Sequence, residues 1–194
     1  ILFMKFKSIL IAYLNNPSNL FPFAFSSIFV AFMFFQGFDF YKHKLHYQTF
    51  TGRVEAYKSP QKIEGFDEKG SRIDENLFEN KLVLLDFWNT KCGVCFEKFP
   101  QLQTFYDKYK DDNTIITYAI NKPIEEDVPR IAFQLVKEKG YTFPVLLPND
   151  ENLPEKFGVK GYPTTFVINR NGQIVYKGDI EGAVKMVAEL KESD

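Results

Sequence analysis

The feature of this sequence that most constrains its fold is an apolar run that ends beside the chain's two cysteines. Residues 81–88 read KLVLLDFW, a nearly continuous apolar stretch that is typical of a central strand covered on both faces. Cys92 and Cys95 follow closely, and apolar side chains then recur at steps of four and three residues, the spacing of one helix face. The predicted buried face of that helix comprises Cys95, Phe99, Leu102, Tyr106 and Tyr109. Both cysteines are therefore expected at a strand–helix junction.

The rest of the chain beyond residue 60 alternates strand and helix patterns. Turn-forming residues at 67–70 and at 170–172 each separate two short strand candidates, which predicts two hairpins. Residues 125–139 read as a helix with acids in the first turn, lysines in the last and Gly140 as its stop. Strands are predicted at 63–66, 72–73, 81–88, 114–120, 143–147, 163–169 and 173–177, with a last helix at 181–192. This order predicts an α/β fold with a mixed central sheet and helices on both faces.

A different pattern occupies the first forty residues. No charged residue lies between Ser8 and Phe38, and residues 20–38 would form a helix roughly 28 Å long. That length is close to the ~30 Å hydrocarbon core of a bilayer, which predicts an N-terminal transmembrane helix. A cleaved signal peptide is the alternative, but no pair of small residues suited to cleavage follows Phe38. We therefore expect an uncleaved membrane anchor.

The sequence thus divides into a segment at 1–19, an anchor at 20–38, a juxtamembrane linker at 39–59 and a domain at 60–194. Six Lys or Arg and two acidic residues lie before residue 61, whereas the remainder carries eighteen and twenty-three. The net charge of −1 provides no bulk positive charge for binding nucleic acid. The cations that follow the anchor weakly favour a cytoplasmic domain by the positive-inside rule.

The spacing and position of the cysteines indicate redox chemistry. At a helix N-terminus the unpaired backbone N–H groups and the macrodipole favour the thiolate, which lowers the pKa of Cys92, and Lys91 adds a positive charge nearby. With two residues between them, the second sulfur can reach the first across one helical turn. Cys92 is therefore the predicted nucleophile. Cys95, on the buried face, is the predicted resolving thiol that releases a mixed disulfide.

Other uses of the two cysteines fit the sequence less well. A structural zinc site needs four ligands, and residues 60–194 contain no further Cys and no His. The histidines of the chain, His43 and His46, lie in a basic stretch with no cysteine nearby, so we predict no metal there. A purely structural disulfide across two residues would stabilise the chain little. A chance pair of buried free thiols is the remaining alternative to a redox pair.

Two motifs give the domain a resemblance to a known family. The segment 84–95 (LLDFWNTKCGVC), with Phe99-Pro100 beyond it, resembles the active-site segment of the thioredoxin superfamily. The segment 159–166 (VKGYPTTF) is similar to that superfamily's cis-proline loop, and residues 166–175 match the strand–turn–strand that follows. The likeness covers about residues 60–192. Together with the anchor and the early hairpin, it resembles the membrane-anchored thiol–disulfide oxidoreductases of the TlpA/ResA type, and it implies a thioredoxin fold.

This resemblance implies roles for further residues. Pro163 would be the cis-proline, which presents the main chain of Tyr162 to a substrate strand. Asp86 would be the buried carboxyl group below the cysteines, with a raised pKa, and would take the proton of Cys95. The alternative for Asp86 is a strand-end carboxylate bonded to backbone. Trp88 is expected to pack beside the disulfide as part of the substrate-binding surface, or to serve in the core alone.

Departures from the family pattern bear on the direction of electron flow. Lys91 replaces the usual aromatic residue before the first cysteine, and Val94 replaces the common proline between the cysteines. Residues 114–120 carry no lysine to pair with Asp86. The dipeptide between the cysteines contains no histidine, the residue that helps strong oxidants to stabilise their thiolate. We therefore expect a reductant, with an oxidant of folding proteins as the alternative.

The residues and the resemblance together predict a membrane-tethered thiol–disulfide oxidoreductase with no cofactor beyond its cysteine pair. Its expected partners are disulfide-containing extracytoplasmic client proteins, such as apocytochromes in cytochrome c maturation, and a membrane electron donor. The implied location is the bacterial cytoplasmic membrane, single-pass, with the domain on the periplasmic side, since large domains cross regardless of flanking charge. Two other functions are less favoured: a peroxiredoxin-type peroxidase needs Thr where Asn89 stands, and a copper-delivery protein needs CxxxC and a histidine in the domain.

Overall fold

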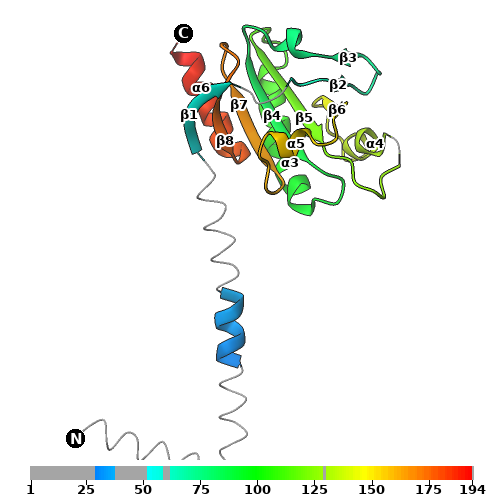
Figure 1. The fold of residues 1–194 in the computed structure, drawn as a ribbon, viewed down its shortest axis with the longest axis vertical. Coiled ribbons are helices and arrows are strands. Elements are labelled where there is room, and N and C mark those ends of the chain that lie inside the picture. The colour runs from blue at the N-terminus through cyan, green and yellow to red at the C-terminus, as the bar shows by residue number, and fades with distance from the viewer. Residues whose placement is uncertain (1–28, 38–51, 59–61, 129, 194) are drawn as a thin grey trace, which may run out of the picture. The chain divides into compact units, whose positions relative to one another are not determined.

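The computed structural model describes residues 29–37, 52–58, 62–128 and 130–193 (Figure 1). The chain divides into two compact units, Ile1–Thr49 and Phe50–Asp194. In the first unit, residues 29–37 form an α-helix. Within the described residues, no helix combines the length and the apolarity needed to cross a bilayer. Most of the predicted anchor lies outside them, as do the segment 1–19 and both histidines, so these remain predictions.

The second unit is built on an eight-stranded sheet with the order β1-β8-β7-β4-β5-β6-β2-β3 (Figure 1). Its strands are β1 (Gly52–Lys58), β2 (Gly65–Phe66), β3 (Arg72–Ile73), β4 (Leu82–Trp88), β5 (Ile115–Asn121), β6 (Val145–Pro148), β7 (Thr164–Ile168) and β8 (Gln173–Gly178). The central strand β4 runs parallel to β5 and antiparallel to β7, and all of its residues are buried. The predicted mixed sheet and its fully covered central strand are confirmed.

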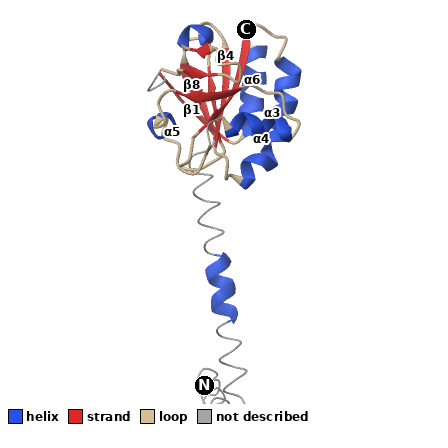
Figure 2. Ribbon diagram, turned by 90° about the vertical axis from the view of Figure 1, so that its right-hand side faces the viewer, coloured by secondary structure: helices blue, strands red, loops and turns tan. Residues whose placement is uncertain are grey.

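Helices cover both faces of this sheet, as predicted (Figure 2). On one face lie α3 (Gly93–Tyr109), α4 (Ile131–Glu138) and α6 (Ile180–Glu192), and on the other lie α5 (Leu153–Lys156) and the 3-10 helix η1 (Glu75–Phe78). Because side chains alternate along a strand, β4 supplies both cores. Leu84 and Trp88 join the core cluster under α3, whereas Leu85 and Phe87 join the cluster under α5.

Two predictions about helices are wrong in detail. On α3 the fourth buried position is Phe105, not Tyr106, which is half-buried. The 3.6-residue period leaves the choice between these neighbours open, and the Phe105 ring packs at 4.9 Å from that of Tyr109. The helix predicted from residue 125 begins only at Ile131. Proline at 129 disfavours a helical conformation for the residue before it, and the acids further upstream are engaged in loop contacts.

The first strand of the sheet lies in residues that the sequence analysis assigned to the juxtamembrane linker. β1 pairs antiparallel with β8, with Arg53 opposite Tyr176 and Tyr57 opposite Ile174. Most of its residues are exposed on both faces, because it is an edge strand. Residues 53–56 alternate polar and apolar side chains, but the run is short and only Val54 packs against a core cluster, so the strand pattern is weak. The sheet therefore begins before residue 60.

Candidate active site

The cysteine pair lies where β4 ends and α3 begins, as predicted. Cys92 is the N-cap of α3 and Cys95 lies within its first turn, and a disulfide joins them with their Cα atoms 5.3 Å apart. The backbone N–H of Cys95 donates a hydrogen bond to the Cys92 Sγ over 3.1 Å. Cys92 is half-buried, whereas Cys95 is fully buried. Only the sulfur of Cys92 is therefore placed to meet a disulfide from outside.

The start of α3 favours negative charge on that outer sulfur. The first N–H groups of a helix lack intrahelical acceptors and form the positive end of its dipole. One of them, the Cys95 N–H, already points at the Cys92 Sγ in the disulfide, so it is in place when that sulfur becomes a thiolate. This geometry suits Cys92 as the nucleophile and Cys95 as the resolving thiol.

Asp86 is a buried carboxyl group in the middle of β4. Its exposed fraction is 3%, and it accepts a hydrogen bond from the Thr165 hydroxyl on β7 over 2.7 Å. Burial raises the pKa of Asp86 to about 7, although the Thr165 bond opposes the rise. The residue opposite Asp86 on β5 is Ala119, which carries no charge to offset burial. The expected desolvated carboxyl group with a raised pKa is confirmed, and its part in proton transfer remains a prediction.

Strand alternation places Asp86 on the same face of the sheet as the disulfide. Leu84 and Trp88, two residues to either side of it, belong to the core cluster that contains Cys95. The adjacent Phe87 belongs to the opposite cluster. Asp86 therefore lies beneath α3, on the side where Cys95 is buried.

The peptide bond between Tyr162 and Pro163 is cis, as predicted. Pro163 is buried, and the half-buried Tyr162 packs against both core clusters. Burial, together with the charge of Glu155, raises the pKa of Tyr162 to about 12, so its phenol is neutral near neutral pH. Cys92 and Tyr162 both pack against the core cluster that contains Cys95, and Tyr162 also packs against the cluster on the opposite face of the sheet.

Trp88 packs in the core next to Cys95. It is fully buried, and its ring stands edge-on to those of Phe96 and Phe99, with centroids 5.8 and 5.1 Å apart. Of the two roles expected for Trp88, core packing is the one observed. The side chain presents no surface to a substrate in this structure, so its role in substrate binding is not supported by its position.

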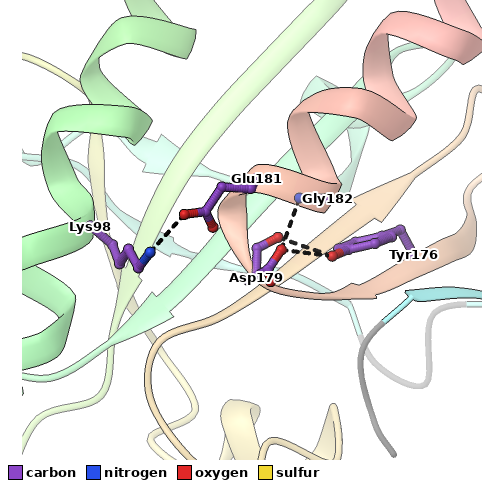
Figure 3. A network of polar contacts seen from close by, with 5 residues as sticks. All are labelled: Lys98, Tyr176, Asp179, Glu181 and Gly182. Atoms are coloured by element: carbon purple, nitrogen blue, oxygen red, sulfur yellow. Dashed lines mark hydrogen bonds and ion pairs between the residues drawn. The ribbon is translucent and has the colours of Figure 1, made fainter. Parts of the chain in front are cut away.

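Polar contacts tie α3 to the start of α6 (Figure 3). Lys98 in the second turn of α3 donates from Nζ to Glu181 Oε1 over 2.6 Å. Asp179 caps α6 by accepting from the Gly182 N–H over 2.8 Å, and it also accepts from the Tyr176 hydroxyl over 3.1 Å. A Cβ at position 182 would lie 2.1 Å from that hydroxyl oxygen, so the Tyr176 side chain would have to shift if a larger residue replaced Gly182. Of these contacts, the Lys98–Glu181 pair joins α6 to the helix that carries Cys95, whereas the Asp179 contacts hold the start of α6 itself.

A segment that the sequence analysis did not associate with the site lies against the approach to the cysteine pair. Asp127 accepts a hydrogen bond from the Thr90 hydroxyl over 2.6 Å. The Nζ of Lys91 lies 3.1 Å from Glu126 Oε1, which offsets the positive charge that Lys91 was expected to add beside the nucleophile. Acids are common in the first turn of a helix, so the sequence analysis assigned residues 125–127 to a helix and predicted no contact between them and the segment before the cysteines.

The described residues contain no group of three or more His, Cys, Asp and Glu side chains placed to hold a metal ion. A cavity of about 310 Å³ lies between η1 and the β7–β8 turn, and one of about 460 Å³ lies between the β2–β3 turn and α4. Neither cavity is lined by a residue of the Cys92–Cys95 motif.

The fold and this site define a thioredoxin-like protein whose cysteine pair can alternate between disulfide and dithiol. The chain belongs to the AhpC/TSA family, whose model matches residues 56–177.

Known thiol-disulfide oxidoreductases are similar to this chain in sequence or in fold. The thiol-disulfide oxidoreductases ResA of Halalkalibacterium halodurans and Bacillus subtilis are each 34% identical over 110 residues. The match covers 56% of this chain and 60% and 59% of those proteins, so it spans about three fifths of their length. The thioredoxin domain of a thiol-disulfide oxidoreductase from Bacteroides vulgatus superposes with a TM-score of 0.60 at 23% identity, covering 70% of this chain and 97% of that one. This last likeness bears on the fold alone.

Proposed function

We propose that this protein is a thiol–disulfide oxidoreductase that transfers two electrons through Cys92 and Cys95. The observation that carries the proposal is the geometry of the pair, a disulfide at the start of α3 with one half-buried and one fully buried cysteine. The names of the two ResA relatives support the same chemistry. The main chain at Tyr162, before the cis-proline, provides an edge along which a substrate strand can pair.

In the reductive direction, the Cys92 thiolate attacks one sulfur of a client disulfide. A bond forms between the two sulfurs, and the client's other sulfur leaves as a thiolate and takes up a proton. The Cys95 thiol then loses its proton and attacks the Cys92 sulfur, which closes the internal disulfide and releases the second client thiol. The client gains two electrons and two protons. The protein ends in the disulfide form that the structure contains.

Asp86 is the proposed acceptor of the Cys95 proton in the resolving step. A pKa of about 7 populates both protonation states near neutral pH, as a general base in this step requires. Thr165 bonds to Oδ1 of the carboxyl group, which leaves Oδ2 to receive the proton. The position of Asp86 on the Cys95 side of β4 supports this assignment.

We further propose that the protein acts as a reductant on the periplasmic side of the bacterial cytoplasmic membrane, tethered through residues 20–38. The uncharged stretch that contains these residues supports the tether, and the absence of histidine between the cysteines supports the reducing direction. Its clients would be disulfide-bearing proteins such as apocytochromes awaiting haem, and a membrane protein would return electrons to the pair. A reporter fused after residue 194 tests the topology: cytoplasmic reporter activity would overturn the assignment.

Reduction of insulin disulfides by the full chain in detergent tests the activity. Cys92→Ser should abolish it, because the attacking sulfur is lost. Cys95→Ser should instead accumulate a mixed disulfide with the client, because the first step proceeds and the second cannot. Full activity in the Cys92→Ser protein would refute the proposed chemistry.

The reduction potential of the Cys92–Cys95 couple tests the direction of electron flow. It is measured by equilibrating the full chain against glutathione or dithiothreitol and trapping the free thiols. A value near the roughly −270 mV of thioredoxin would support a reductant, whereas a value near roughly −120 mV would indicate an oxidant of folding proteins.

A further inference from the structure

Residues 122–128, here called the acidic loop, follow β5 and lie against the segment that leads to Cys92. The loop contains three successive acids at positions 125–127. Its start is joined to the end of β4, because the Lys122 N–H donates to the carbonyl oxygen of Trp88 over 2.8 Å. The acids are thus brought to the site by the sheet itself.

Asp127 uses both carboxylate oxygens in hydrogen bonds. Oδ1 accepts from the Thr90 hydroxyl over 2.6 Å, and Oδ2 accepts from the backbone N–H of Ile124 over 3.1 Å. The first bond reaches across to the segment before the cysteines, and the second closes the turn of the acidic loop. Asp127 is half-buried, and hydrogen bonds to a charged acceptor are stronger than neutral ones. The negative charge of Asp127 is therefore held against Thr90, which lies two positions before Cys92.

Glu126 acts on the residue directly before the nucleophile. Its Oε1 lies 3.1 Å from the Nζ of Lys91, and the two side chains are 67% and 64% exposed. The hydrogen bond from Lys91 lowers the pKa of Glu126, so this carboxylate is charged at neutral pH. An ion pair carries no net charge. The cation that would favour a Cys92 thiolate is therefore largely cancelled.

Glu125 provides a contrast within the same loop. Among the residues that the structure describes, no partner forms a hydrogen bond or an ion pair with this exposed side chain. It carries the same charge as its neighbours but does not engage the segment before the cysteines. Its removal therefore controls for the general effect of one negative charge fewer.

We propose that the acidic loop shifts the cysteine pair toward its disulfide form, through the contacts of Glu126 with Lys91 and of Asp127 with Thr90. The inference deepens the proposed function and rests on it, because it concerns the equilibrium of the same pair. In the disulfide the Cys92 sulfur is uncharged, whereas in the reduced protein it is partly a thiolate. Negative charge held against Thr90, two residues before that sulfur, and a cancelled cation at Lys91 both raise the free energy of the reduced form. The loop therefore makes the protein a stronger reductant.

The test measures one balanced reaction, in which the protein disulfide and two glutathione molecules give the protein dithiol and one glutathione disulfide. The full chain in detergent is equilibrated at set glutathione ratios, and its free thiols are trapped and counted. All other charged groups, among them Asp86, Glu97, Lys98, Lys160 and Glu181, stay constant in all variants.

Glu126→Gln should raise the equilibrium constant for reduction roughly two- to fivefold, the range open to an exposed charge pair. Asp127→Asn should raise it by up to about tenfold, which corresponds to about 30 mV for a two-electron couple. Glu125→Gln is the matched control and should change the constant less than either. Thr90→Val, which keeps both acids but removes the hydroxyl, should shift the constant in the same direction as Asp127→Asn, and Thr90→Ser should restore it.

The proposal is overturned if Glu126→Gln moves the equilibrium no further than Glu125→Gln does, or if it favours the disulfide. Because Glu126 is exposed, this comparison does not depend on whether the Asp127→Asn protein folds. Failure of the proposed function has a different signature. In that case the unmodified protein would leave insulin disulfides intact, while the equilibrium of its cysteines with glutathione would still be measurable.

Discussion

The buried side and the exposed side of the cysteine pair are built from different interactions. Beneath the pair, Asp86 bonds to Thr165 inside the sheet. On the opposite face of the sheet, packed aromatic rings hold the loop before Pro163. Beside the pair, Glu126 meets Lys91 in water, at the surface. Burial makes the first set of contacts important for stability and for proton transfer. The second set adjusts the charge near a sulfur while contributing little to stability.

The largest effect on stability should come from removing a buried aromatic ring that holds the loop before Pro163. Phe157 precedes the Pro163 loop, and its ring lies 5.3 Å from that of Phe87 and 5.5 Å from that of Phe166. Phe157→Ala should lower the free energy of unfolding by about 3–5 kcal/mol, measured by urea denaturation. Phe66→Ala, at a ring that is 46% exposed, is the control and should change it by about 0.5 kcal/mol or less. If both variants lost the same free energy of unfolding, burial of the Phe157 ring would not be what stabilises this loop.

The buried carboxyl group should make stability depend on pH. Folding raises the pKa of Asp86 from 3.8 to about 7, so the folded state holds this proton more tightly than the unfolded state does. The resulting stability is fully present below about pH 4 and is lost as pH rises through about 7. At about pH 8, Asp86→Asn should be more stable than the natural protein, by a difference on the order of 3 kcal/mol. A difference that stays constant between acid and alkaline pH would contradict the raised pKa.

A smaller effect should separate substrate binding from redox equilibrium. Lys177 on β8 donates from Nζ to the carbonyl oxygen of Gly158 over 2.6 Å and lies over the Phe166 ring. Lys177→Met keeps the apolar stem but removes this donor, so the free energy of unfolding should fall by about 1 kcal/mol. Because Gly158 lies in the loop that leads to Pro163, the loss of this bond should loosen that loop and raise the KM for insulin. The equilibrium of the cysteine pair with glutathione should stay unchanged. The reverse pattern would mean that Lys177 acts on the cysteines and not on the Pro163 loop, and Lys177→Arg serves as the donor-retaining control.

The smallest effect concerns the exposed side. Glu126→Gln should leave the urea midpoint unchanged, and its shift of the glutathione equilibrium should disappear in about 1 M salt, where the Debye length is about 3 Å. The pH dependence due to Asp86 should persist in the same salt, because that group is shielded from solvent ions. If the salt removed both effects, the distinction between the two sides would fail.

The parts of the site that were predictable from the sequence depend on short segments. The motif after β4 places both cysteines at the start of a helix, and the apolar neighbours of Asp86 already indicate a desolvated carboxyl group. The resemblance of the motif around Pro163 to the cis-proline loop of the thioredoxin superfamily implied a cis peptide bond, which the structure contains. Each of these inferences needs only residues that adjoin one another in the chain.

The parts that were missed depend on residues from separate elements. The acids at 125–127 have the composition of a first helical turn, yet one of them accepts a hydrogen bond from Thr90, 37 residues away. Nothing in the local pattern distinguishes Phe105 from Tyr106 as the buried position on α3, and only the packing of neighbouring rings does so. β1 was assigned to a linker because its alternation is short and most of its residues are exposed, and only its pairing with β8 identifies it as a strand.

The sequence by itself determined the position of the cysteine pair and the order of the strands and helices from β2 onward, apart from the short helices η1 and α5. These features follow from backbone preferences and side-chain periodicity, which act over a few residues. Only the tertiary structure decided which charges surround the pair. Lys91, which the local sequence presents as a positive charge beside the nucleophile, is paired with Glu126, and Lys98 is paired with Glu181 across 83 residues. Electrostatic interactions depend on distance in space, and folding sets that distance.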